Sequence, residues 1–454
     1  MDSLALLVRT QPRAALRLPL WLLRGKAALK SEVAARVSLD PRHLPWNTAL
    51  LRFLQDEHAS GRRIYLTTGA DLQLAEPIAT HLGIFAGVLA SNGKTNFTGN
   101  NKLDGLRRLF GETGFDYIGN ASADLPLLAA AGAAILANPS AGLCQRLRSR
   151  KIEIAKQFDD HAPRHRAFLK AIRLHQWAKN LLIFLPLVLA HKLSPLPAAQ
   201  TLLAFLAFSL CASATYIVND VLDMEADRHH PRKRLRPFAA GDLSVTAGAA
   251  LSAALLTGAL AIAAFLLPLP FLGWLLLYLV TTLSYSLCVK KIALADVILL
   301  SGLYTLRLLA GAAATRVPIS PWLAAFSLFL FLSLAMVKRF SELQNTRARG
   351  QKPANGRGYL LADIEQLRSF GTSSAYASVV VFSFYIGAHN VTALYPHAAW
   401  LWLITPLMIL WLSRIWLLAS RGELDEDPLV FALTDRMSLL IGVGVALIAA
   451  LAAL

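Results

Sequence analysis

Cysteine and charge are both scarce in this sequence. It contains three cysteines among 454 residues, Cys144, Cys211 and Cys288, and two of them lie inside apolar runs, which argues against a disulfide-bonded scaffold. Charged residues make up 16% of the chain and hydrophobic residues 55%. A water-soluble protein of this length carries more charge and less apolar side chain. The composition therefore excludes a wholly soluble globular protein and indicates a membrane protein.

Acidic residues are also few in this sequence. The chain has 28 Asp and Glu against 45 Lys and Arg, which gives a formal net charge of +17. In a membrane protein this excess predicts basic cytoplasmic loops and contact with anionic head groups or phosphorylated substrates. The cations stand between apolar runs, which argues against nucleic acid. We expect the lipid bilayer and a phosphorylated ligand as partners.

Nine apolar runs after residue 177 approach the length that a helix needs to cross a bilayer. They cover residues 178–193, 200–222, 244–266, 269–289, 292–314, 320–338, 368–389, 397–418 and 435–454. The loops after the second, fourth, sixth and eighth runs hold most cations: Arg232 to Arg236, Lys290, Lys291, Lys338, Arg339, Arg347, Arg349, Lys352, Arg357 and Arg421. The other loops hold almost only Lys192 and Arg316. The positive-inside rule places the basic loops and the N-terminal domain in the cytoplasm, and we expect a protein of a bacterial-type inner membrane.

A group of acids stands at the end of the second apolar run. Asp220, Asp223 and Asp227 are spaced i, i+3 and i+7, so a helix places them on one face, and Asn219 stands beside them. Such oxygens hold Mg²⁺, which usually accompanies phosphates. Cations that could bind the remaining phosphate oxygens follow at once: Arg228, Arg232, Lys233, Arg234 and Arg236. The alternative, solvated charges that only set topology, explains the cations but not three mutually repelling acids near lipid.

The stretch NDVLDMEAD, residues 219–227, resembles the NDxxDxxxD signature of the UbiA superfamily of intramembrane prenyltransferases. The resemblance implies an all-α bundle of nine transmembrane helices over residues 178–454. It also implies that Asn219, Asp220, Asp223 and Asp227 bind Mg²⁺ and, through it, the diphosphate of a donor. The three aspartates are then the expected metal-binding and catalytic residues.

Further candidate residues stand at the ends of the apolar runs or inside them. The stretch RLHQWAKN offers Lys179 and Asn180, and Arg173 as either a site residue or an interfacial anchor. The stretch SYSLCVKKIALAD, residues 284–296, is similar to the family's YSxxLK…D segment. Its substrate-binding candidates are Tyr285, Lys290, Lys291 and Asp296. Arg307 is a candidate because it is ionisable inside a span, with a structural pair to Asp296 as the alternative.

The sixth run ends in SLAMVKRFSEL, which carries Lys338, Arg339 and Glu342. UbiA enzymes that prenylate aromatic rings have a second acidic cluster here, which holds more Mg²⁺. Two cations in its place suit a phosphate that arrives without its own metal. Together with QWAKN, NDVLDMEADRHHPRKRLRP and SGLYTLRLLAG, this feature resembles the decaprenyl-phosphate phosphoribosyltransferase branch. That resemblance implies phosphoribosyl diphosphate as donor and a polyprenyl phosphate as acceptor.

Two other functions stay open at this point. One is prenyl transfer from a polyprenyl diphosphate to an aromatic acceptor, against which the missing second acidic cluster counts. The other is a non-catalytic membrane scaffold for the N-terminal domain. The scaffold predicts that Asp220→Asn and Asp223→Asn leave function intact, whereas the transferase predicts that each nearly abolishes it.

Residues 1–145 show the alternation of strand-like and helical runs that is typical of a soluble α/β domain with a parallel sheet. The strand-like runs are Arg62–Thr68, Phe115–Gly119 and Ala133–Ala137. With Thr68, Lys102 and GNASADLP, the domain resembles a Rossmann-type haloacid-dehalogenase-like (HAD) phosphohydrolase. The opening MDSLALLVRTQP supplies no strand with a nucleophilic DxD motif, and Asn120 replaces an acid, so we expect an inactive docking module or a truncated start. Residues 146–177 would form a basic interfacial connector.

Overall fold

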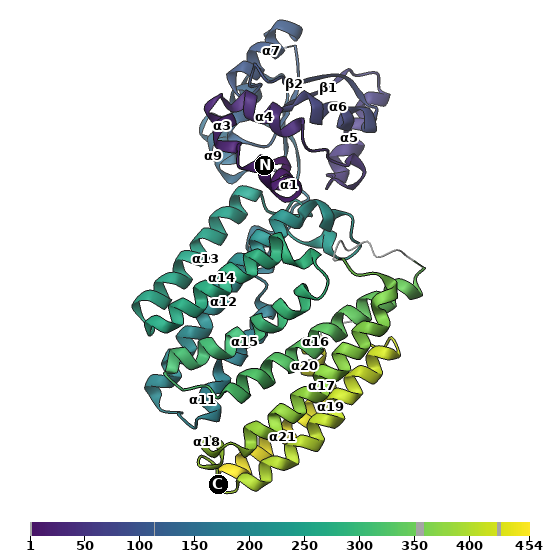
Figure 1. Cartoon of the computed structure of the whole chain (residues 1–454). Helices are drawn as coiled ribbons and strands as arrows, with labels where there is room; N and C mark the ends of the chain where they lie inside the picture. The colour runs from purple at the N-terminus through teal and green to yellow at the C-terminus, as the bar shows by residue number, and fades with distance from the viewer. Residues whose placement is uncertain (1, 113, 351–357, 425–427) are drawn as a thin grey trace. The chain divides into compact units, whose positions relative to one another are not determined.

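The computed structural model describes residues 2–112, 114–350, 358–424 and 428–454, so Lys352 and Arg357 lie outside the described residues. The chain is mainly helical and divides into two compact units (Figure 1). The first unit comprises Met1–Ile172 and Tyr216–Leu251, and the second comprises Arg173–Thr215 and Ser252–Leu454. The domain boundaries expected at residues 145 and 177 stay predictions.

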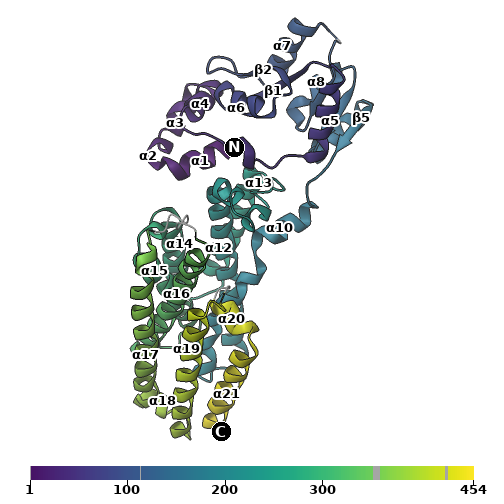
Figure 2. The ribbon, with the colours of Figure 1, turned by 90° about the vertical axis from the view of Figure 1, so that its right-hand side faces the viewer.

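Among the described residues of the first unit, five strands form two parallel sheets (Figure 2). β1 (Ile64–Asp71) pairs with β2 (Phe85–Ser91), and β4 (Ala134–Ala137) lies between β3 (Tyr117–Gly119) and β5 (Ile154–Phe158). The predicted parallel pairing is confirmed, and β1, β3 and β4 overlap the three predicted runs. β2 and β5 lie outside those runs, and β5 belongs to the stretch that we expected to be a connector.

Short helices flank these strands. Their bounds are α1 (Asp2–Thr10), α2 (Pro12–Ala15), α3 (Leu18–Leu23), α4 (Lys26–Ala34), η1 (Pro41–His43), α5 (Thr48–Ala59), α6 (Leu72–Leu82), α7 (Asn100–Phe110), η2 (Ser122–Asp124), α8 (Leu125–Ala130), α9 (Ala141–Ser149), α10 (Arg164–Ile172) and η4 (Lys233–Leu235). Leucines of α7, α8 and α9 pack with β3 and β4 into one core. A smaller core of Leu7, Trp21 and Val33 holds α1, α3 and α4 together.

Eight helical segments in the described part of the chain are long and apolar enough to cross a membrane. They are α12 (Pro195–Arg228), α13 (Val245–Phe265), α14 (Leu269–Leu287), α15 (Ala295–Thr315), α16 (Pro321–Ala348), η6 (Leu361–Asp363) with α17 (Ile364–Gly387), η7 (Ala398–Leu403) with α19 (Ile404–Ser420), and α21 (Arg436–Ala453). The shorter helices are η3 (Leu174–Phe184), α11 (Leu185–Leu189), η5 (Val289–Lys291), α18 (His389–Thr392) and α20 (Pro428–Thr434).

The predicted first span, residues 178–193, is built differently from the others. It consists of η3 followed by α11, and neither is long enough to count as a span. The expectation of nine spans is therefore not confirmed, while eight of the nine predicted runs do form long apolar helices.

The segment η3 packs very closely against α15. A Cβ atom at Gly311 of α15 would lie 2.1 Å from the carbonyl oxygen of Ile183, so only glycine leaves room for the backbone of η3 there. This close approach brings Asn180 of η3 to Arg307, one helical turn before Gly311.

Candidate functional site

Two aspartates of α12, Asp220 and Asp227, converge on one point. The Nη1 atom of Arg236 lies 3.1 Å from Asp220 Oδ1 and 2.6 Å from Asp227 Oδ2. A single guanidinium nitrogen thus bridges two carboxylates that stand two helical turns apart. Asp223 accepts a hydrogen bond from Asn219 Nδ2 at 3.1 Å. Asn219 and the three aspartates are called the aspartate cluster below.

The chain after α12 folds back to deliver Arg236. The N–H group of His230 donates to the Asp227 carbonyl at 3.1 Å, which closes the end of the helix, and the short helix η4 follows. His230 Nδ1 accepts the N–H groups of Arg232 and Lys233 at 3.2 and 3.3 Å. Burial and then the neighbouring cations lower the pKa of His230, which favours the neutral ring that this acceptor role needs.

The cations that follow the aspartates take different positions. Arg228 is buried, and it donates to Glu225 at 3.2 Å and to the Ala239 carbonyl at 3.3 Å. Arg232 and Arg234 are exposed, and Lys233 is half-buried. Arg228 therefore has a structural role at the end of α12, whereas Arg232 and Arg234 present their charge to solvent.

Within the aspartate cluster, Asp220 and Asp227 offer oxygens to one cation position. The bridging nitrogen of Arg236 marks a position where oxygens of two carboxylates surround a positive charge. The donor set is all carboxylate and amide oxygen, which suits Mg²⁺. The Arg236 side chain is 26% exposed and comes from a loop, so its charge can be exchanged for an ion without disrupting α12. The residues that could hold the ion are Asp220, Asp223 and Asp227.

A second charged cluster lies in the second unit, between α15 and α16. Arg339 Nε lies 2.6 Å from Asp296 Oδ2, and Arg339 Nη1 lies 2.8 Å from Glu342 Oε2. Its Nη2 atom donates to the Tyr285 hydroxyl at 3.3 Å. Asp296 is fully buried and also accepts a hydrogen bond from the Tyr359 hydroxyl. The structure thus pairs Asp296 with Arg339, which corrects the alternative that paired it with Arg307.

Arg307 lies in a cage of aromatic and polar groups. Its Nε donates to Asn180 Oδ1 at 2.8 Å and its Nη1 to the Leu303 carbonyl at 2.6 Å. The guanidinium carbon lies 5.1–5.4 Å from three ring centroids, those of Phe208, Tyr278 and Tyr304. Hydrogen bonds and cation–π contacts therefore hold this buried charge. The arrangement brings two predicted candidates, Asn180 and Arg307, into direct contact.

The remaining candidates of the second unit are more peripheral. Lys179 Nζ lies 6.0 Å above the ring of Tyr304. Lys290 and Lys291 both lie in η5, the former half-buried and the latter exposed, and Lys338 is half-buried on α16. Arg173 precedes η3 in a left-handed conformation with φ of 56°. Their roles toward a substrate stay proposals.

In the first unit, Lys102 and Asp124 lie close together. Lys102 Nζ donates to the Tyr117 hydroxyl at 3.0 Å, and this hydroxyl donates to Asp124 Oδ1 at 3.0 Å. The other Asp124 oxygen accepts the N–H groups of Asn120 and Ala121. Burial lowers the pKa of Lys102 in spite of Asp124. With both carboxylate oxygens engaged by the chain itself, the group supports a structural role.

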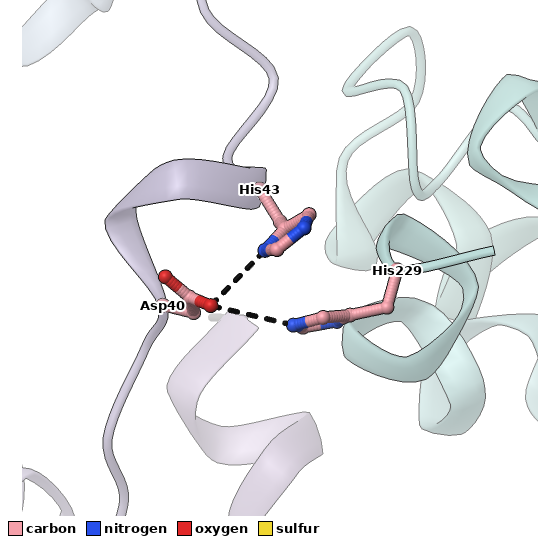
Figure 3. Close-up of side chains that lie close together, drawn as sticks. All are labelled: Asp40, His43 and His229. Atoms are coloured by element: carbon pink, nitrogen blue, oxygen red, sulfur yellow. Dashed lines mark hydrogen bonds and ion pairs between the residues drawn. The ribbon is translucent and has the colours of Figure 1, made fainter. Parts of the chain in front are cut away.

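Asp40, His43 and His229 form another close group, shown in Figure 3. Asp40 Oδ2 lies 3.0 Å from His43 Nδ1 and 3.5 Å from His229 Nε2. Although Asp and His can ligate metals, Arg42 donates to both oxygens of Asp40, at 3.0 and 3.1 Å. These bonds hold the pKa of Asp40 well below its usual range. The group is best described as an ion-pair junction between residues 40–43 and the segment after α12.

Several residues at these clusters escape sequence analysis. Arg9 of α1 lies 2.7 Å from Asp223 Oδ1. Tyr359, which follows α16 in the chain, donates a hydrogen bond to Asp296. The Tyr278 hydroxyl accepts a hydrogen bond from Arg307 Nη2, and its ring lies against the same guanidinium. Each comes from a distant segment without a motif, so only a three-dimensional structure could identify it.

The UbiA prenyltransferase family provides the decisive comparison, because its sequence model matches residues 180–450, more than half of the chain. The chain belongs to the UbiA prenyltransferase family. The expected membership of the UbiA superfamily is thus confirmed. As a UbiA member with eight long apolar helices among its described residues, it is a multi-pass membrane protein.

Relatives of this UbiA chain cover different parts of it. The chain is 39% identical over 435 residues to "Uncharacterized protein y4nM" of Sinorhizobium fredii, an alignment of 95% of this chain and 84% of that protein. It is 34% identical to nodulation protein NoeC of Azorhizobium caulinodans, over 62% of this chain and 91% of that protein. Decaprenyl-phosphate phosphoribosyltransferase of Mycobacterium tuberculosis is 37% identical over 193 residues, 40% of this chain and 62% of that protein.

Among solved structures, a UbiA homologue from Archaeoglobus fulgidus, bound to GPP and Mg²⁺, has a TM-score of 0.47 to this chain at 18% sequence identity. The match covers 63% of this chain and 98% of that chain.

Proposed function

We propose that this UbiA-family protein transfers 5-phosphoribose from phosphoribosyl diphosphate to a polyprenyl phosphate in a bacterial inner membrane. In this proposal Asp220, Asp223 and Asp227 hold Mg²⁺ and the diphosphate of the donor. The partial similarity to decaprenyl-phosphate phosphoribosyltransferase of Mycobacterium tuberculosis supports this substrate pair. The distribution of Lys and Arg among the loops supports a cytoplasmic position for the basic loops and the N-terminal domain.

The observation that carries the proposal is the contrast between two arginines, each placed between carboxylates. Arg236 comes from an exposed loop, and its side chain is 26% exposed. Arg339 stands on α16 beside Glu342, and its side chain is 3% exposed. An ion can replace the first charge, while the second is built into the helix packing. Of these two positions, the one at Arg236 would be an exchangeable cation site, and the other holds a fixed arginine.

One exchangeable site suits a reaction with one metal-bound diphosphate. In phosphoribosyl transfer the bond between ribose C1 and the diphosphate oxygen breaks, and a lipid phosphate oxygen forms the new bond to C1. The diphosphate leaves with the bonding electron pair. The acceptor is already anionic, so no strong general base is needed. When bound, Mg²⁺ neutralises charge that develops on the leaving diphosphate.

The chain's own residues would bind and orient the phosphate groups. We assign the donor's remaining phosphate oxygens to Arg232, Lys233, Arg234 and Arg236, which follow the aspartates, and the lipid phosphate to Lys338 with Arg339. Asn219 orients Asp223 through its hydrogen bond of 3.1 Å. Site roles of Lys179, Asn180, Tyr285, Lys290, Lys291, Asp296, Arg307 and Glu342 belong to the same proposal.

An apolar groove in the second unit suits the lipid tail. It has a volume of about 510 Å³ and lies among α14, α15 and α16, where Leu277, Ile298, Leu306 and Leu328 line it. Apolar lining of this kind favours hydrocarbon over a water-soluble ligand. We infer that a polyprenyl chain binds there.

For the N-terminal domain we propose a HAD-like module without phosphatase activity. The saturated hydrogen bonding of Asp124 by Tyr117, Asn120 and Ala121 supports a structural part for that carboxylate. A phosphatase assay on the purified full chain tests this, and we expect no turnover of phosphate monoesters.

The transfer itself is tested with the purified full chain in detergent, radiolabelled phosphoribosyl diphosphate and a polyprenyl phosphate. We expect label to enter the lipid phase with Mg²⁺ and to stay in water with EDTA. Asp223→Asn should reduce the rate at least about 100-fold, because the carboxylate acts where charge develops in the transition state. Glu225→Gln is the matched control, since Glu225 lies on the same helix and pairs with Arg228 instead.

Two results contradict the proposal. If label enters lipid only when a polyprenyl diphosphate and an aromatic acid are supplied, the protein is an aromatic prenyltransferase. If Asp220→Asn and Asp223→Asn leave function in cells unchanged, the membrane domain is a scaffold.

A further inference from the structure

The N-terminal helix α1 contacts the last turns of α12 through side chains, within the first unit. Arg9 Nη1 lies 2.7 Å from Asp223 Oδ1, and Asp2 Oδ2 lies 2.9 Å from Arg228 Nη2. Asp2 and Arg9 stand at opposite ends of α1, so they are about 10 Å apart along its axis, and Asp223 and Arg228 are about 7.5 Å apart along α12. Two ion pairs therefore link the two ends of α1 to the last turns of α12.

The position of α1 is fixed by packing as well as by charge. Leu7 is completely buried with Trp21 and Val33, so α1 belongs to a folded core. The Asp40–His229 contact of the ion-pair junction, drawn in Figure 3, ties a second N-terminal segment to the residue after Arg228. Arg9 is thus carried by a firmly attached element, while its own side chain is 29% exposed.

The contact between Arg9 and Asp223 concerns the proposed metal site directly. Asp223 Oδ1 faces Arg9, and Asp223 Oδ2 accepts from Asn219. A divalent ion that reaches this carboxylate brings two positive charges, but the diphosphate that comes with it brings more negative charge than that. The site becomes more negative overall, so a guanidinium beside Asp223 stays favoured and gains phosphate oxygens as acceptors.

We propose that Arg9 is a diphosphate-binding residue that the N-terminal domain contributes to the aspartate cluster. In the ligand-free protein Arg9 neutralises Asp223, and with ligand bound it donates to phosphate oxygens. This deepens the proposed function and rests on it in one respect, that a diphosphate binds at the aspartates. It holds for a phosphoribosyl and for a prenyl donor alike.

The test uses the full chain in detergent and two probes, inorganic pyrophosphate with Mg²⁺, and Mn²⁺ alone. Arg9→Ala should weaken pyrophosphate binding at least about tenfold, because a charge-assisted bidentate contact is lost. The same variant should bind Mn²⁺ equally well or more tightly, because a competing cation has left Asp223. Arg13→Ala is the matched control, since Arg13 is an exposed arginine of the neighbouring α2. Isothermal titration and electron paramagnetic resonance give the two affinities.

Two further variants separate the possible failures. Arg9→Lys keeps the positive charge but loses the paired N–H donors of the guanidinium. Its affinity for pyrophosphate should lie between those of wild type and Arg9→Ala, which guards against a folding defect. If Asp223→Asn abolishes pyrophosphate binding while Arg9→Ala binds like Arg13→Ala, the inference about Arg9 is wrong and the aspartate site stands. If wild type and Asp223→Asn bind pyrophosphate equally, or neither binds it, both the inference and the proposed donor site are wrong.

Discussion

Single side chains in this protein hold charge in buried surroundings, and their partners decide what each can do. Asp296 is completely buried against Arg339 and Tyr359. Burial raises the pKa of Tyr359, which keeps its hydroxyl protonated as a donor to that carboxylate. Asp220 and Asp227 are also buried, but their cation comes from an exposed loop. Removing the cation that pairs with a buried carboxylate costs more folding free energy than the ion pair itself contributes, unless another cation can take its place.

This difference predicts opposite responses to metal. Arg339→Ala should destabilise the protein by about 3–5 kcal/mol, because it leaves Asp296 buried without its cation, and Mg²⁺ should not restore the loss. Arg236→Ala should lower the melting temperature in EDTA and regain it with Mg²⁺, because an ion can take the place between Asp220 and Asp227. Thermal unfolding in detergent, with EDTA or Mg²⁺, measures both. Equal rescue of both variants would show that the Arg339 site also accepts an ion.

At the scale of elements, the approach of η3 to α15 sets the position of Arg307. Glycine at position 311 lets the backbone of η3 come close enough for Asn180 to accept from Arg307 Nε. The apolar run at residues 178–193 gives no sign of this packing in the sequence, because hydrophobicity reports burial but not the distance between backbones.

Gly311→Ala should therefore destabilise the second unit by several kcal/mol, on the order of other overpacking changes, since the new Cβ meets a main-chain oxygen that cannot rotate away. Gly302→Ala on the same helix has open space around its Cβ and should be neutral or slightly stabilising through helix propensity. The melting temperatures of the two variants, measured in detergent, test this difference in stability. Equal values would mean that η3 shifts to accommodate the methyl group.

Helix α21 begins at an N-cap that is also half of an ion pair. Asp435 accepts the Ser438 N–H group at 2.8 Å and pairs with Arg414 of α19 at 2.6 and 3.0 Å. The hydrogen bond from Arg414, with those from Ser438, lowers the pKa of Asp435 to about 2.

Because the folded-state pKa of Asp435 is depressed, its stabilisation is present above the unfolded value of about 3.9 and is lost as pH falls toward 2. Asp435→Asn should lower the melting temperature at pH 6, by the equivalent of about 1 kcal/mol for a partly exposed cap and pair. At pH 2.5 the difference from wild type should shrink. A difference that stays constant between these two pH values would contradict the assignment.

At the scale of the whole molecule, the sequence predicts what depends on local periodicity. The spacing of Asp220 and Asp227 predicted that they share one helix face, and both contact Arg236, while eight of the nine apolar runs form long helices. The contacts of Arg9 with Asp223 and of Tyr359 with Asp296 could not be predicted, because they join segments far apart in the chain. The strand β5 was missed because Ala155, Lys156 and Gln157 are exposed, so the stretch lacks the apolar run of a buried strand.

The membrane topology is open to a labelling experiment that also decides between eight and nine crossings. In a variant without the three native cysteines, Lys192→Cys should react with a membrane-impermeant thiol reagent in spheroplasts, if η3 and α11 together cross the bilayer. Gly422→Cys, in a loop predicted to be cytoplasmic, should react only after lysis. Labelling of Lys192→Cys only after lysis would mean that η3 and α11 do not cross.

One consequence follows from the length of α12. This helix has 34 residues, so it is about 51 Å long, while the hydrocarbon core of a bilayer is about 30 Å thick. An upright helix of this length projects from the hydrocarbon, and its acidic final turns can stand in the aqueous head-group zone. In the proposed reaction, a water-soluble sugar phosphate and a chain dissolved in lipid could then meet at the end of one helix without either compound changing phase.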